Sequence, residues 1–279
     1  MRFLLLLVAG SWEPLQVTAV LSDWKLATGN LLRAAGSGYR LLMPGPFHLS
    51  AHVYDVVYSH LDYPASAEYV EGLIRERNPE ASSLLDVACG TGLHLGVWRH
   101  RFDLVVGVDL DPNMLAVARE RLPGIELHEG DFTSFDLART FDAVTCMFSS
   151  IGYANTPEQL DVAIGAFARH LAPGGVMVVE PWFRRSAIQP HAIRGLIVEG
   201  DDVVVARTSR WVEVGDDQSD LEFALLVTTT QGTEHLTERH VMGLYEPERY
   251  VEAAVKAGLE AEFLPDGSPL GRGMLVAVR

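Results

Sequence analysis

Residues 83–96, SLLDVACGTGLHLG, constrain the fold of this chain more than any other segment. They begin with a short apolar run that is typical of a buried strand. Gly90 and Gly92 follow this run, and glycines in that place allow a tight turn and the close approach of a ligand to the main chain. The helix predicted next directs unpaired N–H groups at the same point. The segment therefore predicts a nucleotide-type cradle and leaves the kind of nucleotide open.

Predicted strands and helices alternate around this cradle. The strands cover residues 84–88, 104–109, 125–128, 141–148 and 176–180, and the helices cover residues 93–100, 112–121 and 157–171. Such alternation indicates a mostly parallel sheet with helices on both of its faces.

The pattern changes after the fifth predicted strand. Val- and Thr-rich runs, separated by Gly-Asp-Asp and Gln-Gly turns, indicate antiparallel hairpins at residues 196–198, 203–214, 221–230 and 234–245. A helix at 247–257 and strands at 260–264 and 274–278 close the chain. We therefore expect an α/β fold with three parts: a core of residues 46–182 and 246–279, an inserted antiparallel sheet at 183–245, and an N-terminal extension at 1–45.

Charge and cysteine usage limit the partners of the chain. Its formal net charge of −15 argues against a nucleic-acid or anionic-membrane surface, because both need concentrated Lys and Arg. Cys89 and Cys146 lack metal-ligand spacing and are typical of reduced thiols. The apolar run at 3–10 is far shorter than the ~20 residues that span a bilayer. We expect a cytoplasmic protein with a small-molecule substrate and no metal, and a homodimer stays open.

Acidic residues at the predicted strand ends indicate the cofactor. A dinucleotide site would have G-x-G-x-x-G, and the glycine pair of residues 90–92 lacks the third glycine in register. Asp86, inside the first strand, would repel a pyrophosphate and suits the ammonium of S-adenosylmethionine (SAM). Asp109 ends the second strand, where one carboxylate can accept from ribose hydroxyls, and Asp131 can accept from the adenine amine. The acids therefore favour SAM.

Four motifs of this chain make a family recognisable. LLDVACGTG, VGVDLDPNML, GDFTSF and FDAVTCMFSSIGY resemble, in order and spacing, the motifs of class I SAM-dependent methyltransferases. More narrowly, CMFSSIGY, MVVEPW and SPLGRG resemble the N-methyltransferases that act on dTDP-linked amino deoxysugars in antibiotic pathways. The resemblance runs from about residue 50 to the C-terminus. It implies a Rossmann-like class I fold, SAM as cofactor and enzymatic N-methylation of a nucleotide-linked amino sugar.

The chain departs from that family pattern in three places. The paired aromatics after the Glu-Pro of the MVVEPW motif read Trp182-Phe183, and the approach to Asp62 is shortened. Residues 1–45 have no recognisable counterpart.

The resemblance and the acids together assign binding residues. The predicted cofactor-binding set consists of Asp86, Ala88, Gly90, Gly92, Asp109, Leu110, Met114, Asp131, Phe132 and Met147. The predicted acceptor-binding set consists of Glu180, Trp182, Tyr245 and Arg272, with Trp182 stacking on thymine and Arg272 approaching the diphosphate. Core packing stays an alternative for Met114 and Phe132, and a surface turn charge stays one for Arg272.

The predicted catalytic residues are Tyr153, Tyr54 and His240. Methyl transfer is an in-line displacement by a neutral amine, so an ammonium must first lose a proton. Tyr153 is a weak base at its ordinary pKa of about 10, and we expect it to orient the amine. Tyr54 is expected to close over the sulfonium. His240 and Glu180 are better proton acceptors by chemistry, although a strand histidine is often structural.

Two other functions are compatible with the same motifs. One is O- or N-methylation of a small acceptor without a nucleotide, and the other is SAM binding without turnover. A nucleotide-sized acceptor pocket beyond Tyr153 would disfavour the first, and detectable methyl transfer would exclude the second.

The extension is expected to be dispensable for methyl transfer, because its one clear feature is the short apolar run and the family pattern begins after it. A shortened protein that starts at Met43 should fold, bind SAM and turn over as the full chain does. Thermal unfolding and calorimetric titration with SAM compare the two proteins. Loss of SAM binding in the shorter one would show that the extension belongs to the fold.

Overall fold

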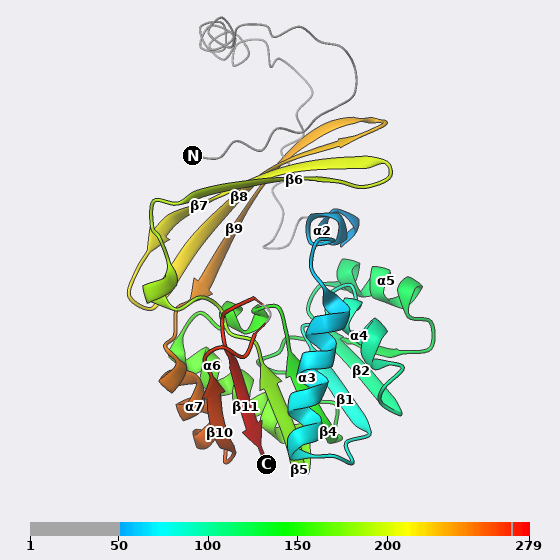
Figure 1. Ribbon diagram of the computed structural model, residues 1–279, viewed down its shortest axis with the longest axis vertical. Coiled ribbons are helices and arrows are strands. Elements are labelled where there is room, and N and C mark those ends of the chain that lie inside the picture. Colours follow the sequence, from blue (N-terminus) through cyan, green and yellow to red (C-terminus); the bar gives the residue numbers. More distant parts are fainter. Residues whose placement is uncertain (1–50, 269) are drawn as a thin grey trace, which may run out of the picture. The chain divides into compact units, whose positions relative to one another are not determined.

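A seven-stranded sheet carries the predicted cradle in the computed structural model, which describes residues 51–268 and 270–279. Its strands are β1 (Ser83–Val87), β2 (Leu104–Asp109), β3 (Glu126–Glu129), β4 (Phe141–Cys146), β5 (Leu171–Val179), β10 (Glu260–Leu264) and β11 (Met274–Val278). The spatial order is β10-β11-β5-β4-β1-β2-β3 (Figure 1). β1 to β5 are parallel, and only the contacts of β11 with β5 and β10 are antiparallel. The expected mostly parallel α/β sheet is confirmed.

Helices bury both faces of this sheet. Successive strand residues point to opposite faces, so Leu84 packs with one helical layer while Leu85 packs with the other. The first layer contains α3 (Tyr63–Arg77), α4 (Leu93–Trp98) and α5 (Pro112–Arg121), and the second contains α6 (Pro157–Arg169) and α7 (Pro247–Lys256). Burial on both sides explains why inner strands such as β1 and β2 are mostly apolar, whereas the edge strand β3 carries polar residues.

Helix starts follow from local sequence. The Asp111 side chain accepts the Asn113 N–H at 2.8 Å, and Pro112 occupies the first turn of α5. Thr156 and Pro157 begin α6 in the same way. The end of α6 differs from the prediction, because the helix stops at Arg169 and β5 already begins at Leu171. Leu171 pairs with Phe141, and a bulge then precedes the pairing of Val176.

The second sheet is antiparallel and consists of β6 (Ile193–Glu199), β7 (Val203–Val214), β8 (Gln218–Thr229) and β9 (Gly232–Gly243). The predicted inserted sheet is confirmed: β7 has the expected bounds, β9 begins and ends two residues earlier than expected, and β6 and β8 are longer because polar residues continue these strands. Helix α2 (Ala51–Val57) buries Val57 against Val205 and Leu225 of this sheet. In Figure 1 the antiparallel strands lie over the edge at which the parallel strands end, with α2 beside them.

Residues 1–45 fall outside the described ranges, so the expectations about the extension stay predictions. Within 51–268 and 270–279, no helix combines the length and the apolar character needed to cross a membrane.

Gly107 of β2 lies in the closely packed core beneath the glycine turn. It pairs with Asp86 of β1 and Leu127 of β3. A Cβ there would lie 2.7 Å from both Leu95 Cδ1 and Leu127 Cδ2 and 2.8 Å from Cys89 Sγ. We expect Gly107→Ala to lower the free energy of unfolding in urea by about 1–3 kcal/mol, because a closely packed core must shift.

Gly165→Ala in α6 is the matched control. No atom lies within 4 Å of its added Cβ, so the better helix former should stabilise the protein by up to about 1 kcal/mol. Equal effects of the two substitutions would contradict this account of the packing.

Candidate active site

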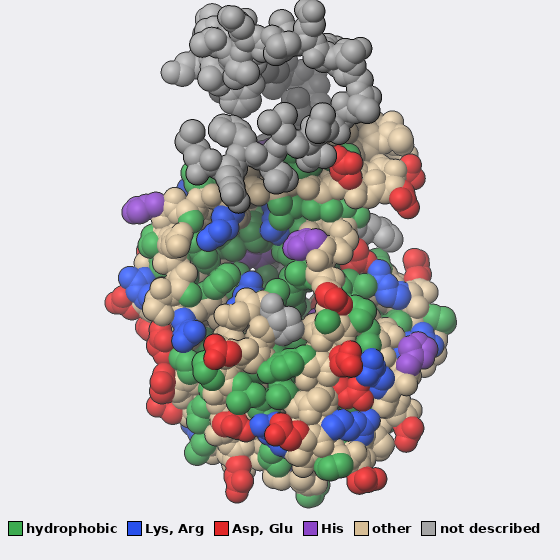
Figure 2. All heavy atoms as spheres, viewed as in Figure 1, with side chains coloured by type: hydrophobic (Ala, Val, Ile, Leu, Met, Phe, Trp, Pro, Cys, Tyr) green, Lys and Arg blue, Asp and Glu red, His purple; other side chains and the backbone are tan. Residues whose placement is uncertain are grey.

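A cavity of about 550 Å³ lies between the carboxyl ends of the parallel strands and the inner face of the antiparallel sheet. This volume falls within the range of small-molecule sites. Figure 2 shows a hollow beneath the antiparallel sheet, with Lys or Arg side chains at its margin. The cavity brings together most of the residues predicted from sequence: Tyr54, Ala88, Gly90, Asp109, Leu110, Met114, Asp131, Phe132, Tyr153, Trp182, His240 and Arg272.

Asp109 is held by backbone donors at one end of this cavity. The Gly90 N–H donates to Asp109 Oδ2 at 2.7 Å, and the Asp111 N–H donates to Oδ1 at 2.9 Å. Burial raises the pKa of Asp109, and these backbone hydrogen bonds act in the opposite direction. Gly90 has φ +57°, and a Cβ there would meet no protein atom within 4 Å. The arrangement presents an oriented carboxylate beside bare backbone, which fits a ligand with vicinal hydroxyls.

Three predicted cofactor residues lie behind the cavity wall. Asp86 is 2% exposed and accepts a hydrogen bond from Thr145 Oγ1 at 2.8 Å. Burial raises the pKa of Asp86 to about 7. A Cβ on Gly92 would lie 2.7 Å from Leu122 Cδ1, and Met147 is buried in the core. Gly92 and Met147 therefore shape the wall without lining it.

The predicted adenine region lies on the other side of Asp109. Asp131 is exposed and its Oδ1 accepts from the N–H and the hydroxyl of Thr133, at 2.8 and 2.7 Å. The Phe132 ring packs edge-on against Phe167 of α6, with 6.5 Å between centroids. Met114 lines the same end of the cavity. An acid, an aromatic ring and a thioether thus all belong to the cavity lining.

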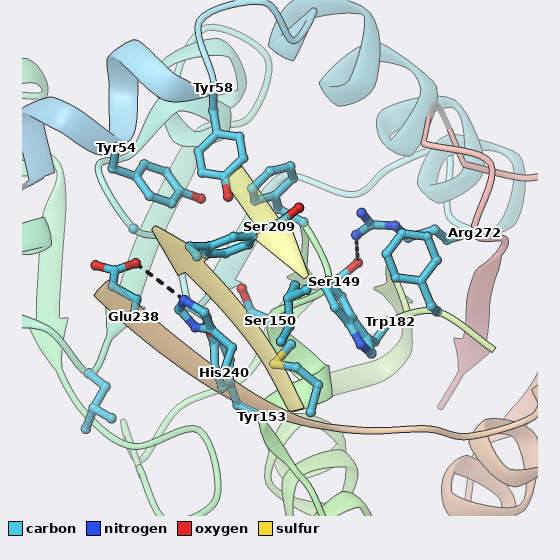
Figure 3. A pocket seen from close by; sticks show the side chains of 18 of the residues that line it. Tyr54, Tyr58, Ser149, Ser150, Tyr153, Trp182, Ser209, Glu238, His240 and Arg272 are labelled. Atoms are coloured by element: carbon cyan, nitrogen blue, oxygen red, sulfur yellow. Dashed lines mark hydrogen bonds and ion pairs between the residues drawn. The ribbon is translucent and has the colours of Figure 1, made fainter. Parts of the chain in front are cut away.

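Two tyrosines, Tyr54 in helix α2 and Tyr58 directly after it, line the cavity. Tyr54 and Tyr58 lie one turn apart, and their ring centroids are 4.7 Å from each other. Both rings meet Phe148 edge-on, at 6.3 and 4.8 Å between centroids. The Tyr58 hydroxyl accepts from Arg207 Nη1 of β7 at 3.0 Å. These aromatic rings join α2 to both sheets at the cavity (Figure 3).

Asp55 connects α2 to the glycine turn. Asp55 accepts from Thr91 Oγ1 at 2.6 Å and pairs with Arg121 Nη2 at 2.5 Å. Arg121 Nη1 also donates to the Thr91 carbonyl at 2.5 Å. The turn that holds Asp109 therefore also determines where Tyr54 and Tyr58 lie.

A strained turn follows β4 and forms the floor of the cavity. Phe148 and Ser149 have φ angles of +55° and +64°, a region that side chains other than glycine seldom occupy. Glu180 accepts the Phe148 N–H at 2.8 Å and a hydrogen bond from Ser268 Oγ. Burial raises the pKa of Glu180. Glu180 lies outside the cavity lining and supports the turn from behind.

Arg272 is a half-buried cation on the aromatic wall. Its guanidinium lies 4.3 Å from the ring centroid of Phe183 and 5.0 Å from that of Trp182, and Nη1 donates to Ser149 Oγ. Its buried Nε has no hydrogen-bond partner, and no ion pair to it occurs within the described ranges. Burial lowers the pKa of Arg272. This cation is available to an anionic ligand.

Tyr153 and His240 meet at the far wall. The Tyr153 hydroxyl lies 2.7 Å from His240 Nδ1, and His240 Nε2 lies 3.4 Å from Glu238 Oε2. Figure 3 shows Glu238 and His240 side by side on β9. Tyr245, in contrast, lies outside the cavity lining: its hydroxyl donates to the Ala154 carbonyl at 2.6 Å within the core.

Several lining residues escaped the sequence analysis: Tyr58, Phe148, Phe183, Arg207, Trp211, Phe223 and Glu238. Two periodicities could have identified some of them. Tyr58 stands four residues after Tyr54, and Glu238 stands two residues before His240 on the same face of a strand. No local signal identifies Arg207 or Phe223 as lining residues.

Comparison with known proteins places this site among methyltransferases. A family described as a methyltransferase domain matches residues 84–175. A dTDP-3-amino-3,4,6-trideoxy-alpha-D-glucopyranose N,N-dimethyltransferase of Streptomyces venezuelae is 42% identical over 231 residues, which are 82% of this chain and 97% of that protein.

Two solved structures resemble the chain over nearly their whole length. The sugar N-methyltransferase KedS8 of a Streptoalloteichus species gives a TM-score of 0.79 at 38% identity, covering 88% of this chain and 98% of that one. The SAM-bound amino pentose methyltransferase CalS10 of Micromonospora echinaspora gives 0.74 at 36% identity, covering 84% and 98%.

Asp109→Ala is expected to weaken binding of SAM, the cofactor predicted from sequence, by about tenfold or more. Charge-assisted hydrogen bonds of the kind that Asp109 offers contribute ~1.5–3 kcal/mol. Calorimetric titration measures the affinity, and circular dichroism checks the fold. Asp216→Ala, in an exposed hairpin turn, is the control and should bind normally. Unchanged affinity of the Asp109 variant would remove that carboxylate from the cofactor site.

Proposed function

The chain belongs to the family of dTDP-amino-sugar N-methyltransferases, and on that premise we propose that it is a SAM-dependent enzyme of natural-product biosynthesis that methylates the amino nitrogen of a dTDP-linked amino deoxysugar. One observation carries this proposal. A single cavity joins a carboxylate oriented by backbone N–H groups to an aromatic wall that carries a half-buried cation. The two ends match the two chemistries that such an enzyme must hold, a nucleoside and an anionic sugar nucleotide.

The residues at the Asp109 end fit SAM, which supplies an electrophilic methyl group on a sulfonium when bound. Asp109 would accept from the ribose hydroxyls, because both of its oxygens are already oriented by N–H groups. The open space above Gly90 lets a ligand approach the main chain. Asp131, Phe132 and Met114 would hold the adenine. Asp86 would act on the ammonium from just behind the wall, near the end of β1, and the positive charge of the ammonium would favour the ionised form of this buried carboxyl, whose pKa burial raises to about 7.

The residues at the Arg272 end suit a diphosphate and a base. A guanidinium with an unpartnered Nε inside a protein costs solvation free energy, which an anion in the cavity would offset. Trp182 already carries the Arg272 guanidinium over its ring, and Phe183 and Trp211 stand edge-on beside it. The thymine would therefore meet an aromatic wall of three rings, of which Trp182 is one.

Rate enhancement in this site would come mainly from positioning. The acceptor amine must lie in line with the methyl group, between the cofactor end and the antiparallel sheet. Tyr54 and Tyr58 cover this junction from α2, and Tyr153 approaches it from the far wall. Covering by aromatic rings excludes water and keeps a neutral amine from being solvated.

The proposal extends to the division of the chain. Residues 46–182 and 246–279 would form the SAM-binding core, and residues 183–245 would supply the acceptor wall. Arg207 and His240 support this division, because both lie on the inserted sheet and line the cavity.

We also propose that the protein is cytoplasmic and forms a homodimer. The two cysteines are free and buried, which suits a reducing compartment. The antiparallel sheet leaves apolar side chains exposed on β6, with Ile193 at 78% and Ile197 at 71%, and such residues are frequent at subunit contacts.

Mass spectrometry of a panel of dTDP-amino sugars incubated with the enzyme and SAM tests the function directly. Mass gains of one or two methyl groups on an amino sugar are expected. Methylation of a small acceptor without a nucleotide, and of no member of the panel, would overturn the assignment of the substrate class.

Arg272→Ala should raise the acceptor KM, or lower kcat/KM, by at least about tenfold while SAM affinity stays near wild type. Truncation of one partner of a partly buried charge pair costs ~2–5 kcal/mol. Arg272→Lys should recover only part of the loss, because a point charge lacks the guanidinium fork. Arg239→Ala, on the outer face of the inserted sheet, is the control. Full kcat/KM in the Arg272→Ala variant would mean that the diphosphate is held elsewhere.

A further inference from the structure

Three polar side chains of the cavity lining, Glu238, His240 and Tyr153, form one hydrogen-bonded line. Glu238 and His240 occupy alternate positions on β9 and point to the same face, and Tyr153 ends the short helix Ser150–Tyr153 after β4. The Tyr153 hydroxyl is 2.7 Å from His240 Nδ1, and Glu238 Oε2 is 3.4 Å from His240 Nε2. Glu238 is 5% and His240 9% exposed, so bulk water does not compete for these hydrogen bonds.

The order of donors along this line follows from the chemistry of its ends. A carboxylate only accepts hydrogen bonds, so the Glu238 carboxylate selects the His240 tautomer that carries its proton on Nε2. Nδ1 of that tautomer holds a lone pair and must receive the Tyr153 O–H. Burial raises the pKa of Tyr153 far above its ordinary value, and the negative charges of Glu238 and Asp109 act in the same direction. The hydroxyl therefore keeps its proton and donates it to His240.

This order leaves the Tyr153 oxygen as an acceptor on the cavity side. Its proton is directed at His240 and its side chain lines the cavity, so a lone pair of the same oxygen can accept a hydrogen bond from a group that enters the cavity. An ammonium offers only N–H donors and suits such a partner. With the other His240 tautomer, Tyr153 would have to turn its proton toward the cavity and repel the same group.

We infer that Glu238, His240 and Tyr153 act as a relay that binds the substrate ammonium and takes its proton. In this step the Tyr153 oxygen accepts a proton from the ammonium while the Tyr153 hydroxyl proton moves to His240 Nδ1. The products are a neutral amine and an imidazolium paired with the Glu238 carboxylate, so charge and protons balance. The inference rests on the proposed function and adds to it the group that removes the proton. Tyr153 is the catalytic residue of the relay, and Glu238 is a positioning residue.

The other acids near the cavity are committed elsewhere. Asp109 accepts from two backbone N–H groups, and Asp131 accepts from Thr133 at the adenine end. Glu180, which the sequence also suggested as a proton acceptor, supports the turn at Phe148 and does not line the cavity. Within the described ranges, Glu238 is the carboxylate that the antiparallel sheet contributes to the cavity lining.

Glu238→Gln tests the relay with little change of shape. The amide places an N–H₂ donor near His240 and removes the preference for a proton on Nε2. We expect kcat to fall by about tenfold to a hundredfold, within the range that positioned proton transfer contributes, while SAM affinity and the acceptor KM change little. Glu234→Gln, an exposed acid of the same strand β9 outside the cavity lining, is the matched control and should keep wild-type kcat.

A double-mutant cycle separates a relay from two independent effects. Tyr153→Phe removes one hydroxyl from the cavity end and should lower kcat by about a hundredfold. If the three groups act as a unit, adding Glu238→Gln to Tyr153→Phe should cause almost no further loss. Multiplicative losses, or a Glu238→Gln variant with wild-type kcat, would overturn the relay. Tyr153→Phe alone keeps the test valid if the Glu238 variant fails to fold, because wild-type kcat in it also excludes the relay.

The His240 tautomer can be read without turnover. Imidazole ¹⁵N shifts of the labelled full-length protein, assigned with a His240→Asn variant, should show the proton on Nε2 in the wild type and its redistribution in Glu238→Gln. A proton on Nδ1 in the wild type would overturn the inference whatever the substrate is. Failure to methylate any amino sugar, with the expected tautomer present, would instead count against the proposed function.

Discussion

The rest of this site depends on the hydrogen bonds that fix the Asp109 carboxylate between the N–H groups of Gly90 and Asp111. Gly90 belongs to the turn after β1, and Asp111 begins α5 after β2, so one side chain joins the ends of two parallel strands. Because the strands are parallel, their carboxyl ends meet at a single edge and can share one ligand. The glycine turn also carries Thr91, which binds Asp55 of α2 and so brings two tyrosines over the same edge. These few hydrogen bonds thus fix both the Asp109 carboxylate and the two tyrosines that lie over it.

Strain and buried charge concentrate around this edge. Phe148 and Ser149 adopt left-handed backbone conformations, and Glu180 holds that turn from behind by accepting the Phe148 N–H. Arg272 donates to Ser149 across the same turn. A relaxed turn would move both the ring of Phe148, which meets the α2 tyrosines, and the anchor of the Arg272 guanidinium. The Arg272 end of the cavity is therefore built on a strained backbone turn, and the surrounding hydrogen bonds offset the conformational cost of that turn.

The antiparallel sheet adds a second wall to the cavity, opposite the carboxyl ends of the parallel strands. Its inward residues alternate with outward ones, so β9 presents Glu238 and His240 to the cavity while Arg239 between them pairs with Asp220 outside. The same alternation brings Arg207 of β7 to the hydroxyl of Tyr58. These polar side chains are tolerated within the sheet because each has a hydrogen-bond or ion-pair partner. The same partners fix how the inward side chains are oriented toward the cavity.

The sequence by itself determined the elements, and it predicted the residues of the proposed cofactor end. The order of strands and helices, the glycine turn, Asp109 and Asp131 are properties of contiguous residues, because periodicity, turn chemistry and caps act over a few positions. It also indicated the hairpins of the inserted sheet, with boundaries off by a few residues where polar positions continue a strand.

Tyr245 and Glu180, expected at the acceptor, lie behind its wall because their partners, the Ala154 carbonyl and the Phe148 N–H, belong to other segments. Only the tertiary structure decided that His240 meets Tyr153 and that Arg272 lies over Trp182 and Phe183. Each contact joins residues far apart in the chain, so it depends on how one sheet lies against the other, which no local pattern records.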